Sequence, residues 1–494
     1  MQNKERNYIA SSRMTVILTG SEIFIQGEHL NQMLACYFLL ICILPVAFAI
    51  KPARMSIFQK KPFIAAWNAP TDLCTSRYNV SLPLKMFHLT GSPLATARGQ
   101  RVTLFYANRL GFYPWYTEEE IPVNGGLPLN CSLEMHLNQS IKDIHKYIPS
   151  EDFNGLAVID WEYWRPQWVR NWDKKDIYRK KSKEYISNGL KNVSASDLEK
   201  LAKVAFENSA KAFMKETVSL GIQIRPKGLW GYYLYPDCHN YKFDSTNYTG
   251  SCPEQEIIRN NELLWLWNSC TALYPSIAIK KSLKDSSNML SFSQFRLIES
   301  MRIALMTNHE YSLPIFVYTR LGYREEPLTF MSLQDLISSV GESAALGAAG
   351  FVVWGDMNLT SSKANCTRVK QYVTSILGHY ITNVTKATEV CSHNICHSNG
   401  RCVRRNSQEP DYLHLNPESF TISRSRGDDF IVTGEPSQTD LELMATKFVC
   451  HCYQGYNGQN CQHNNEADVP LDSAFAIQHN LIACLILVYI FVVL

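Results

Sequence analysis

Residues 155–166, GLAVIDWEYWRP, form the most informative stretch of this 494-residue chain. A small and apolar run from Gly155 to Ile159 leads directly into Asp160 and Glu162. Such a run predicts a buried strand with two carboxylates at its end. Because residues i and i+2 of an extended segment point to the same side, Asp160 and Glu162 are expected to face one space.

Two neighbouring carboxylates suit acid catalysis. They cannot both ionise without cost, and an apolar wall raises the pKa of one of them. Four tryptophans between residues 161 and 172 can form such a wall and can stack on sugar rings. The pair therefore indicates a site that acts on a carbohydrate. The alternative is a structural ion pair with Arg165 or Arg170 at a strand end.

Outward from this stretch, apolar runs alternate with amphipathic segments from about residue 60 to 385, which is typical of an α/β fold. Seven or eight such units favour a closed (β/α) barrel over an open doubly wound sheet, and no glycine-rich phosphate loop follows the first strand. The expected strands are Phe63–Trp67, Val102–Tyr106, Leu156–Ile159, Leu229–Tyr235, Ser276–Ile279, Ile315–Tyr318 and Phe351–Trp354. Active residues of such barrels lie at the carboxyl ends of strands, where the carboxylate pair, Tyr233 and Trp354 also fall.

Two helices between these strands have recognisable ends. Ser196 and Glu199 have the spacing of a capping box, and the helix that they open is expected to end at Gly221. Ser332 and Asp335 open a second helix, which leads into the last expected strand of the barrel.

Cysteines and glycosylation sequons indicate an oxidising, glycosylating compartment. The chain has 15 cysteines. Asparagines in Asn-x-Ser/Thr sequons are Asn79, Asn130, Asn138, Asn192, Asn247, Asn358, Asn365 and Asn383. We therefore expect a protein of the secretory pathway with its catalytic domain outside the cell.

Apolar segments lie near both ends. Residues 33–50, within an N-terminal region 1–50, match a signal peptide, with an uncleaved signal anchor as the alternative. The C-terminal region 463–494 ends in 14 residues without a charge. Small residues before a polar spacer give it the outline of a lipid-anchor signal, with a terminal membrane helix as the alternative. Either form predicts attachment to a membrane at the cell surface.

The pattern changes near residue 386. Six cysteines between residues 386 and 462 match the spacing of an epidermal-growth-factor-like module that is split by an insertion at 403–449. Spacing alone permits many disulfide connectivities for six cysteines. The chain thus divides into a barrel domain at 51–385 and a small cysteine-rich module.

Other features narrow the class of protein. The net charge of +3 is too small to indicate nucleic acid as a partner, and no nucleic-acid-binding motif is present. The 13 histidines have no zinc spacing, so neither a metal nor another cofactor is expected. The tyrosine-rich stretch 228–241 could be core packing or could place a hydroxyl near the carboxylates. Cys238 and Cys252 would close a short loop beside it.

Several stretches together resemble the mammalian hyaluronidases, a family of glycoside hydrolases. They are residues 61–71, 155–172, 228–238 and 341–355, with the split cysteine module after them. The resemblance covers about residues 55–462. Residues 230–241 and 318–327 are most similar to a branch of the family that is regarded as hydrolysing chondroitin sulfate.

This resemblance implies a distorted (β/α) barrel that cleaves a glycosaminoglycan within its chain by a substrate-assisted, retaining mechanism. Glu162 would be the general acid, and the acetamido oxygen of the substrate would be the nucleophile. Asp160 would hold the acetamido nitrogen, and Tyr233 would help to position that group. Positions that match the family's groove give Tyr106 and Trp354 as ring contacts, with Arg165 beside the acid.

The resemblance also implies a disulfide pattern. The implied pairs are Cys74–Cys366, Cys391–Cys402, Cys396–Cys450 and Cys452–Cys461, beside the Cys238–Cys252 loop. Cys131 and Cys270 have no evident partner in the resemblance.

Two departures from the family bear on the substrate. Ala278 stands where hyaluronan-cleaving relatives have a groove tyrosine, and the smaller side chain should enlarge a subsite and weaken hyaluronan cleavage. Arg324 stands where some relatives have an acidic residue, so that a sulfate could be favoured, although an exposed pair with Glu325 is an equal alternative. We expect chondroitin or chondroitin sulfate as the preferred substrate and hyaluronan as the second. The alternative is a catalytically weak glycosaminoglycan-binding or adhesion protein.

Overall fold

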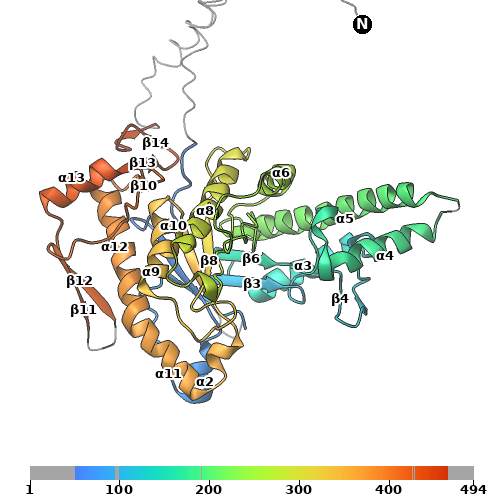
Figure 1. Cartoon of the computed structure of the whole chain (residues 1–494), viewed down its shortest axis with the longest axis horizontal. Helices are drawn as coiled ribbons and strands as arrows, with labels where there is room; N and C mark the ends of the chain where they lie inside the picture. Colours follow the sequence, from blue (N-terminus) through green and yellow to red (C-terminus); the bar gives the residue numbers. More distant parts are fainter. Residues whose placement is uncertain (1–50, 95–99, 191, 426, 428, 466–494) are drawn as a thin grey trace, which may run out of the picture. The chain divides into compact units, whose positions relative to one another are not determined.

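The computed structural model describes residues 51–94, 100–190, 192–425, 427 and 429–465 (Figure 1). These residues belong to one compact unit, Lys51–Asp468. The expected signal segment and C-terminal anchor lie outside the described residues. Within the described ranges, no helix combines the length and apolar character that a membrane span requires.

Parallel strands form a closed barrel. They are β1 (Ile64–Asn68), β2 (Leu89–Thr90), β3 (Val102–Tyr106), β6 (Leu156–Asp160), β7 (Leu229–Tyr232), β8 (Phe316–Arg320) and β9 (Gly350–Trp354). They pair in the orders β2-β1-β9-β8 and β3-β6-β7. Single bridges through residues 273–276 connect β7 to β8, and the Arg101 N–H donates to the Thr90 carbonyl between β2 and β3 at 3.0 Å. The expectation of a barrel is confirmed, but the expected strand Ser276–Ile279 is reduced to one bridge between Ser276 and Tyr318.

Helices surround the barrel (Figure 1). They are α2 (Asp72–Tyr78), α3 (Leu133–Tyr147), α4 (Asp176–Ser187), α5 (Ala195–Ile224), α6 (Glu254–Glu262), α7 (Leu264–Trp267), α8 (Ser287–Met306), α9 (Leu333–Leu336), α10 (Glu342–Ala345), α11 (Lys363–Tyr372), α12 (Gly378–Ile395) and α13 (Gln438–Lys447). Short π-helical segments, Ile337–Gly341 and Val373–Leu377, connect α9 to α10 and α11 to α12.

Apart from β2, whose Thr90 is exposed, the barrel strands are buried on both faces, and alternate residues enter different cores. In β6, Leu156 and Val158 belong to the inner core, while Ala157 and Ile159 pack in the larger core that includes the helices. This alternation follows from the two-residue period of a strand. The inner row of β6 therefore continues from Leu156 and Val158 to Asp160.

The start and end of α5 differ from the expectation. Ser194, not Ser196, caps the helix, because its extended backbone lets its Oγ accept the Asp197 N–H at 3.1 Å. The helix also continues past Gly221 to Ile224. A Cβ at Gly221 would lie 2.7 Å from the ring of Trp230, so this glycine allows close packing rather than ending the helix. The cap at Ser332 lies where it was expected.

The C-terminal cysteine-rich part packs against the barrel through α12, and the expected boundary at residue 385 falls inside this helix. Two antiparallel pairs follow, β10 (Gly400–Arg404) with β13 (Phe448–Cys452) and β11 (Phe420–Arg424) with β12 (Phe430–Gly434). A short pair in the same part is β14 (Tyr456–Asn457) with β15 (His463–Asn464). Another short pair, β4 (Trp115–Tyr116) with β5 (Pro122–Val123), lies in the segment between β3 and β6. The Arg404 guanidinium forms a fully buried ion pair with Glu342 of α10, which holds the C-terminal part to the barrel.

The first described residues are tied to the last. The Ala53 N–H donates to the Cys452 carbonyl at 2.7 Å, and the Gln454 N–H donates to the Ala53 carbonyl at 2.8 Å. The His451 imidazole also contacts the Lys51 carbonyl at 2.8 Å. The N-terminal segment therefore closes against the C-terminal part.

Candidate active site

The inner rows of five strands end in polar or aromatic side chains at one mouth of the barrel. These residues are Tyr106 from β3, Asp160 from β6, Tyr233 just after β7, Arg320 from β8 and Trp354 from β9. Strand register pairs Tyr106 with Asp160 and Arg320 with Trp354. The Tyr233 N–H donates to the Ile159 carbonyl at 2.9 Å, which holds this tyrosine beside β6. The sequence-predicted residues Tyr106, Asp160, Tyr233 and Trp354 therefore meet at the carboxyl ends of the strands.

Asp160 is poised to hold a proton. Burial raises the pKa of its carboxyl group to about 8, and the nearby charge of Glu162 adds to the increase, while Arg165 opposes it. At neutral and acidic pH the two carboxylates therefore share at least one proton, and in the free enzyme burial favours Asp160 as its location.

Glu162 lies outside the strand and is accessible. Its side chain is 48% exposed, and its carboxylate lies 3.4 Å from an Arg165 guanidinium nitrogen. The Arg165 guanidinium also donates to the Glu162 carbonyl at 3.2 Å, and the Lys175 ammonium donates to the same carbonyl. The backbone of Glu162 is thus fixed, while its carboxylate remains free to reach a ligand.

Two tyrosines flank the carboxylates in their protonated form. Burial raises the pKa of Tyr106 to about 12, with a further increase from the charge of Asp160. Burial also raises the pKa of Tyr233, and the charge of Glu162 adds a smaller increase. The Tyr233 hydroxyl lies 3.4 Å from Ser276 Oγ. Both hydroxyls can therefore donate a hydrogen bond to a substrate oxygen.

Ala278 and Arg324, the two positions expected to bear on the substrate, lie close together. Ala278 is partly exposed and follows two residues after Ser276, whose hydroxyl contacts Tyr233. The Arg324 N–H donates to the Ile279 carbonyl at 2.9 Å. Ala278 and Arg324 therefore border the same part of the barrel mouth.

Sequence reasoning missed two functional candidates. The Arg320 guanidinium stacks 4.3 Å from the centre of the Trp354 ring and pairs with Asp356 at 3.1 Å. Lys175 binds the backbone at Glu162. Arg320 could have been found from the two-residue period of its strand, which places it in the inner row with Tyr318. Lys175 could not, because it reaches Glu162 from a separate loop.

Comparison with known proteins gives the family. A family model described as hyaluronidase matches residues 52–465. The chain belongs to the hyaluronidase family. Human Hyaluronidase-4 is 64% identical over 444 residues, which cover 90% of this chain and 92% of the human protein. Hyaluronidase-1 of Bitis arietans is 45% identical over 85% of this chain and 94% of its own length.

A solved structure of the hyaluronidase family shares the fold. Bee venom hyaluronidase in complex with a hyaluronic acid tetramer is 28% identical, with a TM-score of 0.58, over 65% of this chain and 98% of that chain. Together with the family match, this likeness makes the protein a glycoside hydrolase of hyaluronidase type with a barrel like that of triosephosphate isomerase.

The described residues form five disulfides, with the same pairs that were expected from the sequence. They are Cys74–Cys366, Cys238–Cys252, Cys391–Cys402, Cys396–Cys450 and Cys452–Cys461. Among the described cysteines, Cys131 and Cys270 are free. Burial raises the pKa of the Cys270 thiol to about 12, so this thiol is unreactive. In the same ranges, no three His, Cys, Asp or Glu side chains gather as a possible metal site.

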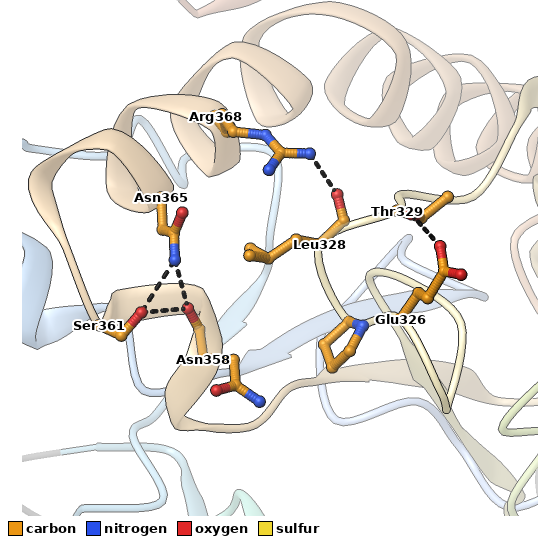
Figure 2. Close-up of a pocket in the computed structure, with 8 residues that line it drawn as sticks. Glu326, Leu328, Thr329, Asn358, Ser361, Asn365 and Arg368 are labelled. Carbon is orange, nitrogen blue, oxygen red and sulfur yellow. Dashed lines mark hydrogen bonds between the residues drawn. The ribbon is translucent and has the colours of Figure 1, made fainter.

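The sequon asparagines differ in exposure. Six are exposed, namely Asn79, Asn130, Asn138, Asn192, Asn247 and Asn358, while Asn365 and Asn383 are half-buried. Figure 2 shows Asn365 at a pocket of about 400 Å³, where its amide donates to the Asn358 carbonyl and to Ser361 Oγ. The Asn383 side chain accepts the Leu415 N–H at 3.0 Å. A glycan replaces a hydrogen of the amide nitrogen, so at Asn365 it would displace one of these donated bonds, whereas at Asn383 it would leave the acceptor oxygen in place. The exposed six are the better acceptors because their side chains are accessible.

Proposed function

We propose that this hyaluronidase-family enzyme cleaves chondroitin or chondroitin sulfate within the chain, with hyaluronan as a second substrate. The observation that carries the proposal is the convergence of Asp160, Glu162 and Tyr233 at the mouth of the barrel. The hyaluronic acid tetramer bound to the bee venom relative supports a glycosaminoglycan as the substrate class. The intact acid pair favours catalysis over a purely adhesive role.

The proposed reaction is retaining and uses a nucleophile from the substrate. Glu162 donates its proton to the glycosidic oxygen as the bond to C1 breaks. The acetamido oxygen of the same sugar forms a new bond to C1 and gives an oxazoline-like intermediate. Water then attacks C1 as the C1–O bond of the intermediate breaks, which restores the acetamido group. The water gives its proton to Glu162, which restores the acid. In this reaction only one carboxyl group protonates the glycosidic bond, while the other holds the acetamido group. One exposed and one buried carboxyl group suit these roles better than two equally accessible acids.

Substrate binding would move the shared proton. An acetamido N–H that donates to Asp160 stabilises its charged form, which favours transfer of the proton to Glu162. Tyr233 can donate its hydroxyl to the acetamido group, because the high pKa of Tyr233 keeps this hydroxyl protonated. Binding of an N-acetylhexosamine would thus favour the position of the proton at Glu162.

The preference for chondroitin follows from the groove next to Tyr233. Ala278 leaves space where hyaluronan-cleaving relatives have a ring, and Arg324 adds a cation next to that space. A larger subsite with a cation suits a sulfated N-acetylgalactosamine.

The test is chain-length measurement of chondroitin sulfate and hyaluronan digests between pH 4 and 8. The wild-type protein should shorten at least one polymer, and Glu162→Gln should reduce the rate roughly a hundredfold to ten-thousandfold. Glu216→Gln, a change at an exposed residue of α5 outside the acid pair, is the matched control. Failure of the wild type to shorten either polymer would remove the enzyme proposal, and activity in Glu162→Gln would remove the assignment of the acid.

We also propose that the catalytic domain lies outside the cell and is attached to a membrane. Five disulfides and six exposed sequon asparagines support an extracellular domain. We propose that the three C-terminal disulfides belong to an epidermal-growth-factor-like module. Release from cells by a phosphoinositide-specific lipase would distinguish a lipid anchor from a terminal helix.

A further inference from the structure

A second group of charged side chains lines a hollow of about 200 Å³ next to Glu162. Among its lining residues are Arg165, Trp172, Lys174, Lys175, Asp237 and His239. These residues come from the loops after β6 and β7, not from the inner rows of the barrel. Apart from Arg165, none of them has a part in the proposed reaction. We call this hollow the lysine pocket.

Most charges in the lysine pocket are already compensated. Arg170 pairs with Glu256 at 2.7 Å, and Asp237 pairs with Arg296 at 3.4 Å. Lys174 and Lys175 have no ion-pair partner in the described part of the chain. Of the two carboxylates in the lining, Asp237 is paired with Arg296, so Asp173 is the one that opposes the lysines. The pocket therefore has an excess of positive charge.

Lys175 has a donor left for a ligand. Its ammonium group donates to the carbonyls of Glu162 and Tyr163, the latter at 3.2 Å, so one of its three protons remains. Burial lowers the pKa of Lys175 to about 8, and the charge of Arg165 adds a smaller decrease. The group is still charged at neutral and acidic pH. A half-buried cation with an unused donor is well placed to bind an oxyanion.

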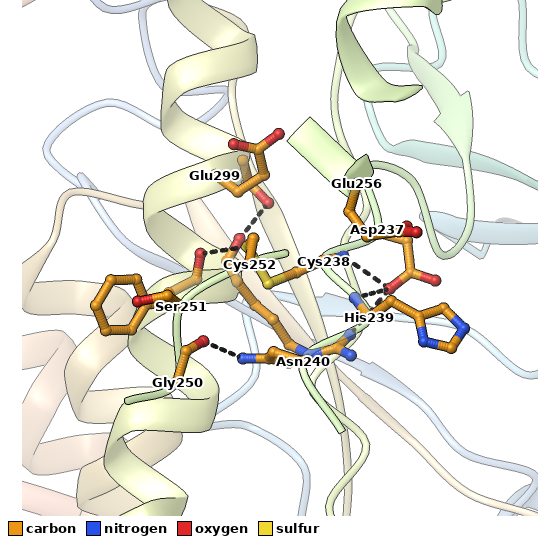
Figure 3. The surroundings of a disulfide bond; sticks show 12 residues. Asp237, Cys238, His239, Asn240, Gly250, Ser251, Cys252, Glu256 and Glu299 are labelled. Atoms are coloured by element: carbon orange, nitrogen blue, oxygen red, sulfur yellow. Dashed lines mark hydrogen bonds and ion pairs between the residues drawn. A yellow bond between two sulfur atoms is a disulfide. The ribbon is translucent and has the colours of Figure 1, made fainter. Parts of the chain in front are cut away.

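The walls of the pocket are fixed and include an aromatic face. The Trp172 side chain is half exposed, and its ring lies 5.8 Å from that of His239. Asp237 Oδ1 accepts the N–H groups of Cys238 and His239, and the Cys238–Cys252 disulfide holds this loop (Figure 3). An aromatic face beside a cation is a suitable surface for one anionic sugar.

We propose that the lysine pocket binds an oxyanion of the glycosaminoglycan on the leaving-group side of the scissile bond. Asp160 and Tyr233 are the groups proposed to hold the sugar that is attacked. Arg165 lines the lysine pocket and also contacts the Glu162 carboxylate, so the pocket lies next to the general acid. A polymer cleaved within its chain must continue past Glu162, where these cations lie. The oxyanion is a uronate carboxylate or a sulfate ester. The inference rests on the proposed function, because it assumes a glycosaminoglycan in the groove.

The test compares KM and kcat of the wild type with those of the double variant Lys174→Gln, Lys175→Gln. The substrates are oligosaccharides of unsulfated chondroitin, chondroitin sulfate and carboxyl-reduced unsulfated chondroitin. The variant should raise KM about tenfold, as expected for a lost charged hydrogen bond, with a smaller change in kcat. Lys174→Arg, Lys175→Arg should restore KM, and Lys203→Gln, Lys215→Gln on α5 is the control for lost charge alone.

The substrates identify the source of the oxyanion. A rise in KM for sulfated chains alone assigns the sulfate. A similar rise for unsulfated chondroitin, absent after carboxyl reduction, assigns the carboxylate. An unchanged KM for every anionic substrate, or an equal rise for the carboxyl-reduced chain, would overturn the proposal.

Binding separates this inference from the proposed function. Oligosaccharides added to Glu162→Gln should change the emission of Trp172, and Trp172→Phe should abolish the change. If the wild type cleaves no polymer while this signal still depends on the two lysines, the enzymatic proposal fails and the lysine pocket stands. If cleavage occurs but neither KM nor the signal depends on the lysines, the pocket proposal fails alone.

Discussion

The different environments of Asp160 and Glu162 give two chemically similar side chains different roles. Asp160 ends a buried inner row, and its pKa is raised to about 8, whereas the Glu162 side chain is 48% exposed two residues later. A separation of two residues is therefore enough to give one buried carboxyl group that retains its proton and one accessible carboxyl group that can donate a proton to the substrate. The sequence placed both carboxylates at one strand end, but only burial distinguishes them.

Ala278 offers a test of substrate choice at the residue scale. Ala278→Tyr should raise the rate of hyaluronan cleavage relative to chondroitin by roughly threefold to tenfold, because a ring adds a stacking surface and fills the subsite. Initial rates on the two polymers at equal chain length give the ratio. Ala278→Val is the control for added volume without a ring. An unchanged ratio in Ala278→Tyr would contradict the subsite argument.

His88 and His136 give a pH test. Burial lowers the pKa of each to about 4, with the charge of Lys61 adding to the effect at His88. The unfolded chain binds more protons below pH 6.5, so the stability from each histidine is present above pH 6.5 and is lost as pH falls toward 4. The loss is on the order of 3 kcal/mol per residue.

Denaturant midpoints at pH 7, 5.5 and 4 measure this loss. His88→Asn keeps an acceptor for the Ala65 N–H but does not titrate, so its midpoint should fall less steeply. His393→Asn, at an exposed site, should follow the wild type. Equal pH slopes in wild type and His88→Asn would contradict the assignment.

The cap of α5 shows what local pattern can predict at the element scale. Ser194 and Ser196 are each followed three residues later by an acidic residue, so spacing cannot choose between them. Ser194→Ala should weaken the first turn by about 1 kcal/mol, while Ser196→Ala should leave it nearly unchanged. Hydrogen exchange of residues 197–204 measures the difference. Greater loss of protection in Ser196→Ala would contradict the cap.

The barrel strands were largely predictable, and the reason is physical. An apolar run between turn residues identifies a strand that is buried on both faces, as in β3, whose bounds match the expectation. The prediction of a strand at residues 276–279 was wrong because the barrel closes there through single bridges rather than through a ladder of paired residues. The prediction that Gly221 ends its helix was wrong because this glycine packs against Trp230, a residue of the next strand that the local pattern does not reveal.

The candidate site was predictable only in part. Tyr106, Asp160, Tyr233 and Trp354 follow expected strands, so their meeting follows from the barrel. Arg165 lies beside Glu162 as the resemblance implied. The contact of Lys175 with the same backbone depends on how a long loop folds back, which no periodic pattern encodes.

At the scale of the whole molecule, the Glu342–Arg404 pair joins the C-terminal part to the barrel. Both side chains are fully buried, and Gln294 donates to Glu342 at 3.1 Å. Glu342→Gln leaves the Arg404 charge unpaired and should reduce the free energy of unfolding by about 3 to 5 kcal/mol.

A paired replacement tests whether charge is the cause. Glu342→Leu with Arg404→Met removes both charges and should recover much of the loss in thermal or denaturant unfolding. Glu326→Gln breaks the exposed pair with Lys281 and should leave the midpoint nearly unchanged. A double variant as unstable as Glu342→Gln would contradict the assignment.

The contact of Ala53 with Cys452 and Gln454 has a consequence for biosynthesis. Ala53 forms these bonds with residues that the ribosome adds about 400 residues later, near the end of translation. The Cys74–Cys366 bond, with a separation of 292 residues, imposes a similar delay on the barrel. Nascent chains must therefore keep their N-terminal segment unpaired through most of synthesis, and truncations before residue 450 should be retained by quality control rather than exported.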